Sequence, residues 1–336
     1  MDRATAGRHN AITDVPGIRV GHATRIGDGA LTGTTVLLLP PGTTATVDVR
    51  GGAPATRETT ALDPRYGGRE IPAIVLTGGS SYGLSTADGV QTWLGGPNPL
   101  VPAAALFDLG RGGDFTRRPD AALAIEAAEA ASATVAQGNV GAGTGAVNAG
   151  LKGGIGTASR VLPGGVVVAA IAALNAVGPS VDFATGLPHG HATGVSHRLR
   201  DGEVVAWQEF PDFAGDDLAA ARARLQDTAS NPLNTVIGVV ATNARLDAAQ
   251  LFHLANAAQD GLALAVRPAH GLYDGDTVFA ASTGTADADA AEVVAAATEV
   301  FARALVHGLL AAQPVGHFAA YRELYPMTAQ GYPGAD

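Results

Sequence analysis

Apolar runs alternate with alanine-rich amphipathic stretches along this chain. Short β-branched runs bounded by glycine and proline predict strands. We predict strands at residues 18–23, 34–39, 45–49, 73–77, 104–109, 157–162, 165–174 and 277–283, and in the run that begins at residue 235. Helices are predicted at about 82–94, 120–131, 216–225 and 289–312. A glycine-rich loop is predicted at 138–156.

A further helix is predicted after residue 247. Asp247 is a favourable N-cap, Leu251 and Leu254 lie on one face, and Gly261 is expected to end the helix. Four predicted strands precede the first convincing helix, and strands and helices do not alternate strictly. This order favours an α+β layered sandwich over a doubly wound parallel sheet.

The polar loop at residues 228–233 leads directly into an apolar run that begins at Thr235. A threonine at the start of a buried strand, after a loop that could be cut, is where an N-terminal nucleophile would lie. If the Asn234-Thr235 bond is broken, Thr235 gains a free α-amine, which can act as the base for its own hydroxyl. The alternative is a strand that simply opens with a β-branched residue.

Composition limits the functions that this chain can have. With 336 residues, 46% of them hydrophobic and 15% charged, it can bury a large core, so we expect one large domain or two closely packed halves. A net charge of -10 without basic runs argues against binding to nucleic acid or to anionic membranes. The first residues lack a signal pattern, and the longest apolar run, 166–174, is too short to span a membrane. We therefore expect a soluble, cytoplasmic protein. The absence of cysteine excludes disulfides, thiolate metal sites and cysteine nucleophiles.

A serine competes with Thr235 as the nucleophile. Residues 79–83 read GSSYG, follow a predicted strand and open a helix, which is the context of a nucleophile elbow centred on Ser81. Four strands without an intervening helix are unlike the start of an α/β-hydrolase, and glycine-serine turns are common in a chain with 45 glycines.

Two further motifs are weaker. Residues 141–146, GAGTGA, partly match a dinucleotide-binding loop, but the preceding segment is weakly strand-like and no acidic residue stands at the expected offset. His189, His191 and His197 suggest a metal, but they lie in a glycine- and proline-containing loop without an evident carboxylate partner.

Two features favour Thr235. Asp274 and Asp276 precede the last strand, and residues two apart project to the same side of an extended chain. Two close carboxylates repel, so one can hold a proton near neutrality while the other accepts hydrogen bonds; a simple Asp-Gly turn is the alternative. Lys152 is the only lysine among 21 basic residues, and it lies in the glycine-rich loop. Such selective use of an ammonium indicates a buried site, although a surface turn remains the alternative.

These residues together resemble a known family, the L-aminopeptidase/D-esterase and β-aminopeptidase family, which includes the nylon-oligomer endo-hydrolases. The resemblance covers nearly the whole chain. It rests on ITDVPGIRVGH at 12–22, RGGA at 50–53, TGGSSYGL at 77–84, LKGGIG at 151–156, LNAVG at 174–178, NT at 234–235 and LYDGDTVF at 272–279. It implies a four-layer αββα sandwich of the N-terminal-nucleophile type. It also implies self-cleavage into an α chain, 1–234, and a β chain, 235–336.

The resemblance implies a role for each site residue. Thr235 is the nucleophile, Lys152 is a nearby cation, and Asn175 helps to hold the oxyanion. Asp274 and Asp276 match a carboxylate pair that orients the nucleophile and the amine. The substrate-binding positions implied are Phe107, which borders the pocket, and Ser81 and Tyr82, whose turn becomes a structural or pocket-lining feature. No metal or organic cofactor is implied, and family members resemble tetramers of cleaved units.

The family divides by substrate. In its aminopeptidase branch, the family resemblance implies a serine nucleophile and a Ser-x-Glu motif in the place of Asp274-Gly275-Asp276. This chain has Thr235 with Asp274 and Asp276 instead. That combination resembles the nylon-oligomer hydrolases, so we expect a small amide substrate such as a 6-aminohexanoate oligomer. An aminopeptidase acting on free-amine peptides, amides or esters is the alternative. A serine hydrolase, a self-cleaving acetyl transferase and a non-enzymatic scaffold are the more distant rivals.

Overall fold

The computed structural model describes residues 4–66, 69–213, 234–326 and 332. Its larger sheet has nine strands, and the neighbouring strands β15 and β16 are parallel. In spatial order the strands are β14 (Glu203–Ala206), β13 (His197–Arg200), β1 (Thr5–Ala6), β11 (Ile155–Leu162), β12 (Val166–Ala173), β15 (Ile237–Ala244), β16 (Thr277–Ala286), β4 (Thr44–Val49) and β6 (Arg69–Glu70).

A second sheet has five strands. In order they are β2 (Arg19–Gly27), β3 (Ala30–Leu38), β7 (Ala73–Thr77), β8 (Ala103–Ala105) and β5 (Thr56–Arg57). The glycine-rich segment carries a separate ribbon made of β9 (Val147–Asn148) and β10 (Leu151–Lys152).

Helices flank both sheets. The described α-helices are α1 (Ser80–Gly83), α2 (Thr86–Leu94), α3 (Ala121–Glu129), α5 (Ala248–Ala265), α6 (Ala290–Ala311) and α7 (Tyr321–Leu324). Short 3-10 helices are η1 (Ile12–Asp14), η2 (Thr60–Leu62), η3 (Pro64–Tyr66), η4 (Gly141–Gly143), η5 (Pro163–Gly165) and η6 (His191–Thr193).

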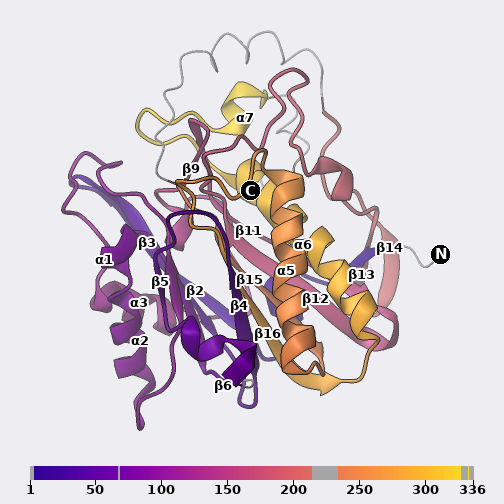
Figure 1. Ribbon diagram of the computed structural model, residues 1–336. Helices are drawn as coiled ribbons and strands as arrows, with labels where there is room; N and C mark the ends of the chain where they lie inside the picture. The colour runs from indigo at the N-terminus through magenta and orange to yellow at the C-terminus, as the bar shows by residue number, and fades with distance from the viewer. Residues whose placement is uncertain (1–3, 67–68, 214–233, 327–331, 333–336) are drawn as a thin grey trace.

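Three apolar cores separate four layers, because successive side chains of a strand point to opposite faces of the sheet. Along β12, Val168 and Ala170 pack in the core under α5 and α6, whereas Ala169 and Ile171 pack in the core between the two sheets. A third core, with Val75 of β7 in it, lies between the second sheet and helices α2 and α3. Figure 1 shows α5 and α6 on one side of the molecule and α1 to α3 on the other. The predicted α+β, four-layer αββα sandwich is confirmed.

Most predicted elements have the predicted type, although their bounds differ, and two of them differ clearly from the prediction. The strand predicted at 104–109 is shorter, since β8 ends at Ala105. The helix predicted at 82–94 is two helices, α1 and α2. The Thr86 hydroxyl donates to Gly83 O at 2.6 Å where they meet, which replaces part of the regular helical ladder. The helix predicted at 216–225 lies outside the described residues.

The predicted end of α5 at Gly261 is wrong. The helix continues to Ala265, and Gly261 lies inside it, facing α6. A Cβ added to Gly261 would lie 2.3 Å from Thr298 O, so glycine is needed there because the two helix backbones approach closely. Gly261 therefore marks close packing between α5 and α6 rather than the end of a helix.

Helix α6 is the only helix in the described residues that is long and apolar enough to cross a membrane. In the structure 78% of its apolar window is buried, and its side chains form the core against β11 and β12. This burial is typical of the core helix of a layered fold.

Candidate active site

The register of the central strands brings Thr235 and the Asp-Gly-Asp motif together. Ile237 of β15 pairs with Thr277 of β16 in parallel, so the residues two positions before each strand also lie side by side. Gly275 N accordingly donates to Thr235 Oγ1 at 3.1 Å. On the other side, Ile237 pairs with Ala173 of β12 in antiparallel register, which places Asn175 beside Thr235. The Thr235 amide donates to Asn175 O at 2.6 Å.

Thr235 is 4% exposed, and its hydroxyl lies 2.5 Å from the carbonyl oxygen of Asn234. The hydroxyl therefore lies next to the peptide group that it would attack in self-cleavage. The amide of Gly275 contacts the same hydroxyl oxygen and can stabilise negative charge on it. The candidate nucleophile and the candidate scissile bond thus lie inside the sandwich rather than on its surface.

Asp276 and Asp274 are held by separate sets of donors. Asp276 Oδ1 accepts from Val236 N at 2.8 Å, and its Oδ2 accepts from His270 N at 3.1 Å and lies 2.9 Å from His270 Nδ1. Asp274 Oδ1 accepts from Val177 N at 3.2 Å, and Asp274 Oδ2 accepts from Gly271 N at the same distance. Burial, and then the charge of Asp276, raise the pKa of Asp274 to about 6.

Asn175 has one donor without an acceptor. Its Oδ1 accepts from Arg111 Nη1 at 2.6 Å and from Val147 N at 2.9 Å, which fixes the orientation of the amide. Its Nδ2 is buried and has no hydrogen-bond partner in the part of the chain that the structure describes. A buried donor without an acceptor is costly, so it is a natural place for an oxyanion.

Lys152 is fully buried, and all three protons of its ammonium are used by backbone carbonyls. Nζ donates to Gly143 O at 2.8 Å, to Ala146 O at 2.9 Å and to Gly153 O at 2.5 Å. Burial, and then the charge of Arg111, lower the pKa of Lys152 well below its usual range. The lysine holds the glycine-rich segment in place, and the amide of Val147 in that segment donates to Asn175. Lys152 therefore affects the surroundings of Thr235 indirectly, through this segment and Asn175.

Arg111 and Asp108 are among the residues at the site that were missed from the sequence. Arg111 Nη1 also donates to Gly145 O at 2.6 Å, and Arg111 Nη2 donates to Asn234 Oδ1 at 2.6 Å. Burial lowers the pKa of Arg111 to about 10, which leaves it charged at neutral pH. An arginine between glycines at 110, 112 and 113 was the available sequence signal.

Asp108 fixes the turn that carries Ser81. It accepts from the Thr32 hydroxyl at 2.6 Å and from Gly79 N at 2.7 Å. Burial raises the pKa of Asp108 to about 6. Ser81 and Tyr82 are exposed on α1, and the Tyr82 ring lies under Arg118, 4.1 Å from ring centroid to guanidinium carbon.

The elbow at Ser81 has the predicted strand-turn-helix context but no triad. Among the described residues, no histidine or carboxylate is hydrogen-bonded to the Ser81 hydroxyl. Phe107 lies one residue before Asp108, is partly buried, and packs against Phe115 with ring centroids 6.5 Å apart.

The dinucleotide and metal motifs have packing roles. The segment 141–143 forms η4, and Ala142 N donates to the Thr35 hydroxyl of β3. His191 Nδ1 lies 2.8 Å from Pro188 O. Within the described ranges, no cluster of three histidine, aspartate or glutamate side chains could hold a metal ion.

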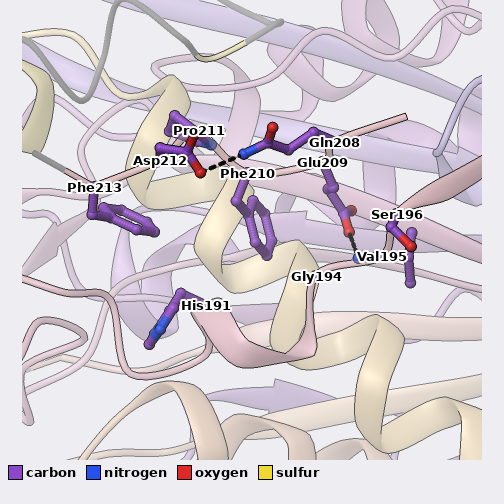
Figure 2. A pocket seen from close by; sticks show the side chains of 10 residues that line it. All are labelled: His191, Gly194, Val195, Ser196, Gln208, Glu209, Phe210, Pro211, Asp212 and Phe213. Carbon is purple, nitrogen blue, oxygen red and sulfur yellow. Dashed lines mark hydrogen bonds between the residues drawn. The ribbon is translucent and has the colours of Figure 1, made fainter. Parts of the chain in front are cut away.

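A separate pocket of about 300 Å³ is lined by residues before and after the edge strands β13 and β14, and its lining contains neither Thr235 nor the residues around it. Figure 2 shows Glu209 in its wall, bonded to Val195 N, with Phe210 and His191 nearby. Glu209 belongs to a buried ion pair with Arg303, which is fully buried. This pocket is therefore built over a structural charge network.

Solved structures with a similar architecture include a variant of the Ntn hydrolase fold. The chain matches a Burkholderia sp. beta-aminopeptidase with a TM-score of 0.69, at 25% identity over 98% of this chain and 96% of that one. It matches the L-aminopeptidase D-Ala-esterase/amidase of Ochrobactrum anthropi, described as a variant of the Ntn hydrolase fold, with a TM-score of 0.68 at 22% identity, covering 93% of this chain and 89% of that one. The fold is that of the Ntn hydrolases.

The sequence comparisons place the chain more narrowly. The model of peptidase family S58 matches residues 10–322. An uncharacterized aminopeptidase of Mycobacterium tuberculosis (strain ATCC 25618 / H37Rv) is 44% identical over 359 residues, covering 94% of this chain and 98% of that protein. A 6-aminohexanoate-oligomer endohydrolase of Kocuria sp. (strain KY2) is 32% identical over 308 residues, covering 84% and 78%. The chain belongs to peptidase family S58 and is a hydrolase of the aminopeptidase type, which confirms the family resemblance.

Proposed function

We propose that this chain is a self-processing amide hydrolase that cuts itself between Asn234 and Thr235 and then works as an aminopeptidase with Thr235 as its N-terminal nucleophile. The observation that carries the proposal is the Thr235 hydroxyl, which lies 2.5 Å from Asn234 O in a buried site. The Asn175 Nδ2 donor, which has no acceptor among the described residues, supports it.

Self-cleavage starts when Thr235 Oγ1 attacks the carbonyl carbon of Asn234. The C–N bond breaks, its nitrogen takes up a proton, and Asn234 is left as an ester on the threonine oxygen. Water then hydrolyses this ester, leaving a carboxylate on Asn234 and a free α-amine on Thr235. We assign the proton exchange to Asp274, because burial and the charge of Asp276 raise its pKa to about 6.

Turnover repeats this chemistry on an external amide. The α-amine of Thr235 takes the hydroxyl proton, the oxygen attacks the substrate carbonyl, and the amine product leaves with a proton. Asn175 Nδ2 donates to the oxyanion, and Lys152 and Arg111 keep Asn175 in position through the carbonyls and amides that they bind. Asp276, bonded to Val236 N, holds the backbone next to the nucleophile.

Denaturing mass spectrometry of the purified protein, beside Thr235→Ala and Thr235→Ser, tests the proposal. The wild type should give a β chain of 336 - 234 = 102 residues that begins with threonine. Thr235→Ala should remain one inactive chain, whereas Thr235→Ser should still cut because it keeps a hydroxyl. Ser81→Ala is the matched control and should cut normally. An active wild type with no Thr235 amino terminus would overturn the proposal.

A 6-aminohexanoate oligomer is a second candidate substrate. It is supported by the combination of Thr235 with Asp274 and Asp276, and by the similarity to the Kocuria endohydrolase. An oligomer with its amine acylated, assayed beside free-amine aminoacyl p-nitroanilides, separates the two candidates. Cleavage of the anilides alone favours the aminopeptidase, and cleavage of the blocked oligomer favours the nylon-oligomer hydrolase. We also propose that the cleaved units assemble into a homotetramer in the cytoplasm. Light scattering of the purified protein would test the tetramer by measuring its mass.

A further inference from the structure

The side chain of Asn234 is held at both ends of its carboxamide. Its Oδ1 accepts from Arg111 Nη2 at 2.6 Å, and its Nδ2 donates to Ala176 O at 3.0 Å. Asn234 is 3% exposed, so both hydrogen bonds lie away from solvent. Arg111 and Ala176 O together match a carboxamide, because Arg111 donates a hydrogen bond to its oxygen and Ala176 O accepts one from its nitrogen.

Asn234 is the acyl residue of the self-cleavage reaction. Since the same Thr235 hydroxyl attacks in both reactions, the carbonyl of an external substrate must occupy the place of the Asn234 carbonyl. The side chain of the substrate's acyl residue then falls where the Asn234 side chain lies in the uncut chain. After cleavage Asn234 is the end of the α chain, and it must move out before a substrate can bind.

Building on the proposed function, we propose that Arg111 and Ala176 O form an acyl-residue pocket that selects substrates with asparagine at the cleaved amide. A hollow of about 450 Å³ includes Arg111 in its wall, between residues 26–31 and 315–317. Arg111 is the residue that this hollow shares with the contacts of the Asn234 side chain. The substrate class is amides and peptides whose N-terminal residue is asparagine.

The pocket discriminates against near relatives of asparagine. Aspartate can pair with Arg111, but its second oxygen would face Ala176 O, and two acceptors repel. Leucine offers Arg111 no acceptor in place of the Asn234 oxygen, and glutamine places its carboxamide one methylene too far. A hydrogen bond to a charged group in a buried site corresponds to a factor of roughly 10 to 100 in kcat/KM.

The experiment compares L-aminoacyl p-nitroanilides of asparagine, aspartate, glutamine, leucine and alanine on the cleaved wild-type enzyme. The asparagine anilide should have a kcat/KM at least about tenfold above the aspartate and leucine anilides. Free L-asparagine should inhibit turnover of the alanine anilide more strongly than L-leucine does. A cut enzyme that hydrolyses the alanine anilide without preferring asparagine would overturn the inference and leave the proposed function standing.

Variants locate the preference at Arg111. Because Arg111 also holds Asn175, Arg111→Leu should lower all rates, so the readout is the ratio of kcat/KM for the asparagine and alanine anilides, which should fall by about tenfold. Arg245→Leu is the matched control, since Arg245 is an exposed arginine paired with Asp287, and it should keep the ratio. An Arg111→Leu enzyme with the wild-type ratio overturns the inference. If that variant does not cut itself, the wild-type panel and the inhibition by free amino acids decide alone. A wild type that neither cuts itself nor hydrolyses any anilide overturns the proposed function and this inference together.

Discussion

His270 Nδ1 lies 2.9 Å from Asp276 Oδ2, and the other oxygen of Asp276 accepts from Val236 N, one residue after Thr235. The imidazole therefore orients the carboxylate that holds the start of β15. Its Nε2 is buried and has no hydrogen-bond partner among the residues that the structure describes. His270 was not identified from the sequence, although it stands only six residues before Asp276.

We predict that His270→Ala slows both self-cleavage and turnover by about tenfold or more, because one hydrogen bond to a charged acceptor is lost. His270→Asn should retain more activity, since its amide can still donate to Asp276. The kcat, compared with the melting temperature of the same variant, separates positioning from mere loss of stability. His253→Ala, on the exposed face of α5, is the control. An unchanged rate in His270→Ala would remove the residue from the mechanism.

The raised pKa of Asp274 predicts a stability change with pH. The folded protein holds a proton on Asp274 up to about pH 6, whereas the unfolded chain loses it near the ordinary aspartate pKa of 3.8. The folded state therefore binds more protons between these values, and the free energy of unfolding falls as pH rises through about 4 to 6. The free energy of unfolding should be measured in the Thr235→Ala variant, because that variant is expected to remain one uncut chain.

We expect Asp274→Asn in the Thr235→Ala background to raise the melting temperature at pH 8 and to change it little at pH 4, where the carboxyl group is already neutral. Asp287→Asn, at an exposed position, is the control for a general charge effect. An equal shift at both pH values would contradict the assignment. In the active enzyme Asp274→Asn should reduce turnover by about 10²- to 10⁴-fold if the group exchanges a proton in the reaction.

Lys152 predicts a chemical signature, because it carries the only ε-amine in the chain. Buried and bonded to three carbonyls, it should resist amine acylation in the native protein and react once after denaturation. Mass spectrometry of acylated peptides measures this directly. Rapid modification of native Lys152 would contradict its burial.

Lys152→Met should leave buried carbonyls without donors, each at a cost of roughly 1 to 3 kcal/mol, so the melting temperature should fall clearly. Lys152→Arg should also be damaging, since a planar guanidinium does not fit three carbonyls around one point. Self-cleavage should slow in both variants because the segment that holds Asn175 loosens. Wild-type stability together with lost activity would instead indicate direct contact of the lysine with substrate.

The buried pair of Glu209 and Arg303 predicts loss of stability in acid. Burial alone would raise the pKa of Glu209, but Arg303 and His307 beside the carboxylate outweigh it and hold that pKa well below its usual range. A depressed carboxyl pKa gives stability that is present above about pH 4.5 and lost as pH falls below it.

Glu209→Gln removes the fully buried carboxylate from Arg303 and leaves the partly buried Glu299 as its charged partner among the described residues, so it should reduce the free energy of unfolding by about 3 to 5 kcal/mol. Glu203→Gln, exposed on β14, is the control and should be neutral. The kcat of surviving Glu209→Gln enzyme at low temperature should match the wild type, since Figure 2 places Glu209 in a pocket without catalytic residues. A stable Glu209→Gln protein would contradict the role of this pair.

Local patterns determined much of this protein from the sequence alone. The β-branched runs and their flanking glycines predicted the strands, the spacing of elements predicted an α+β sandwich, and Thr235, Asp274 and Asp276 were singled out because a strand start and a two-residue spacing are properties of the chain itself. Gly261 shows the limit of such patterns. A glycine needed for close packing between α5 and α6 looks the same in sequence as one that ends a helix.

Only the tertiary structure decided how the site is assembled. The register between β15, β16 and β12 joins Thr235 to Gly275 and Asn175, and no local pattern specifies that register. Arg111 lies 123 residues from Asn234 in the chain, yet it binds the side chain of that residue, because folding brings a turn of the second sheet against the ends of the first. Lys152 was noticed as unusual in the sequence, but only the fold shows that its amine donates hydrogen bonds to three backbone carbonyls. Hydrophobic periodicity records which face of an element is buried, whereas contacts between polar groups far apart in the chain depend on how the layers stack.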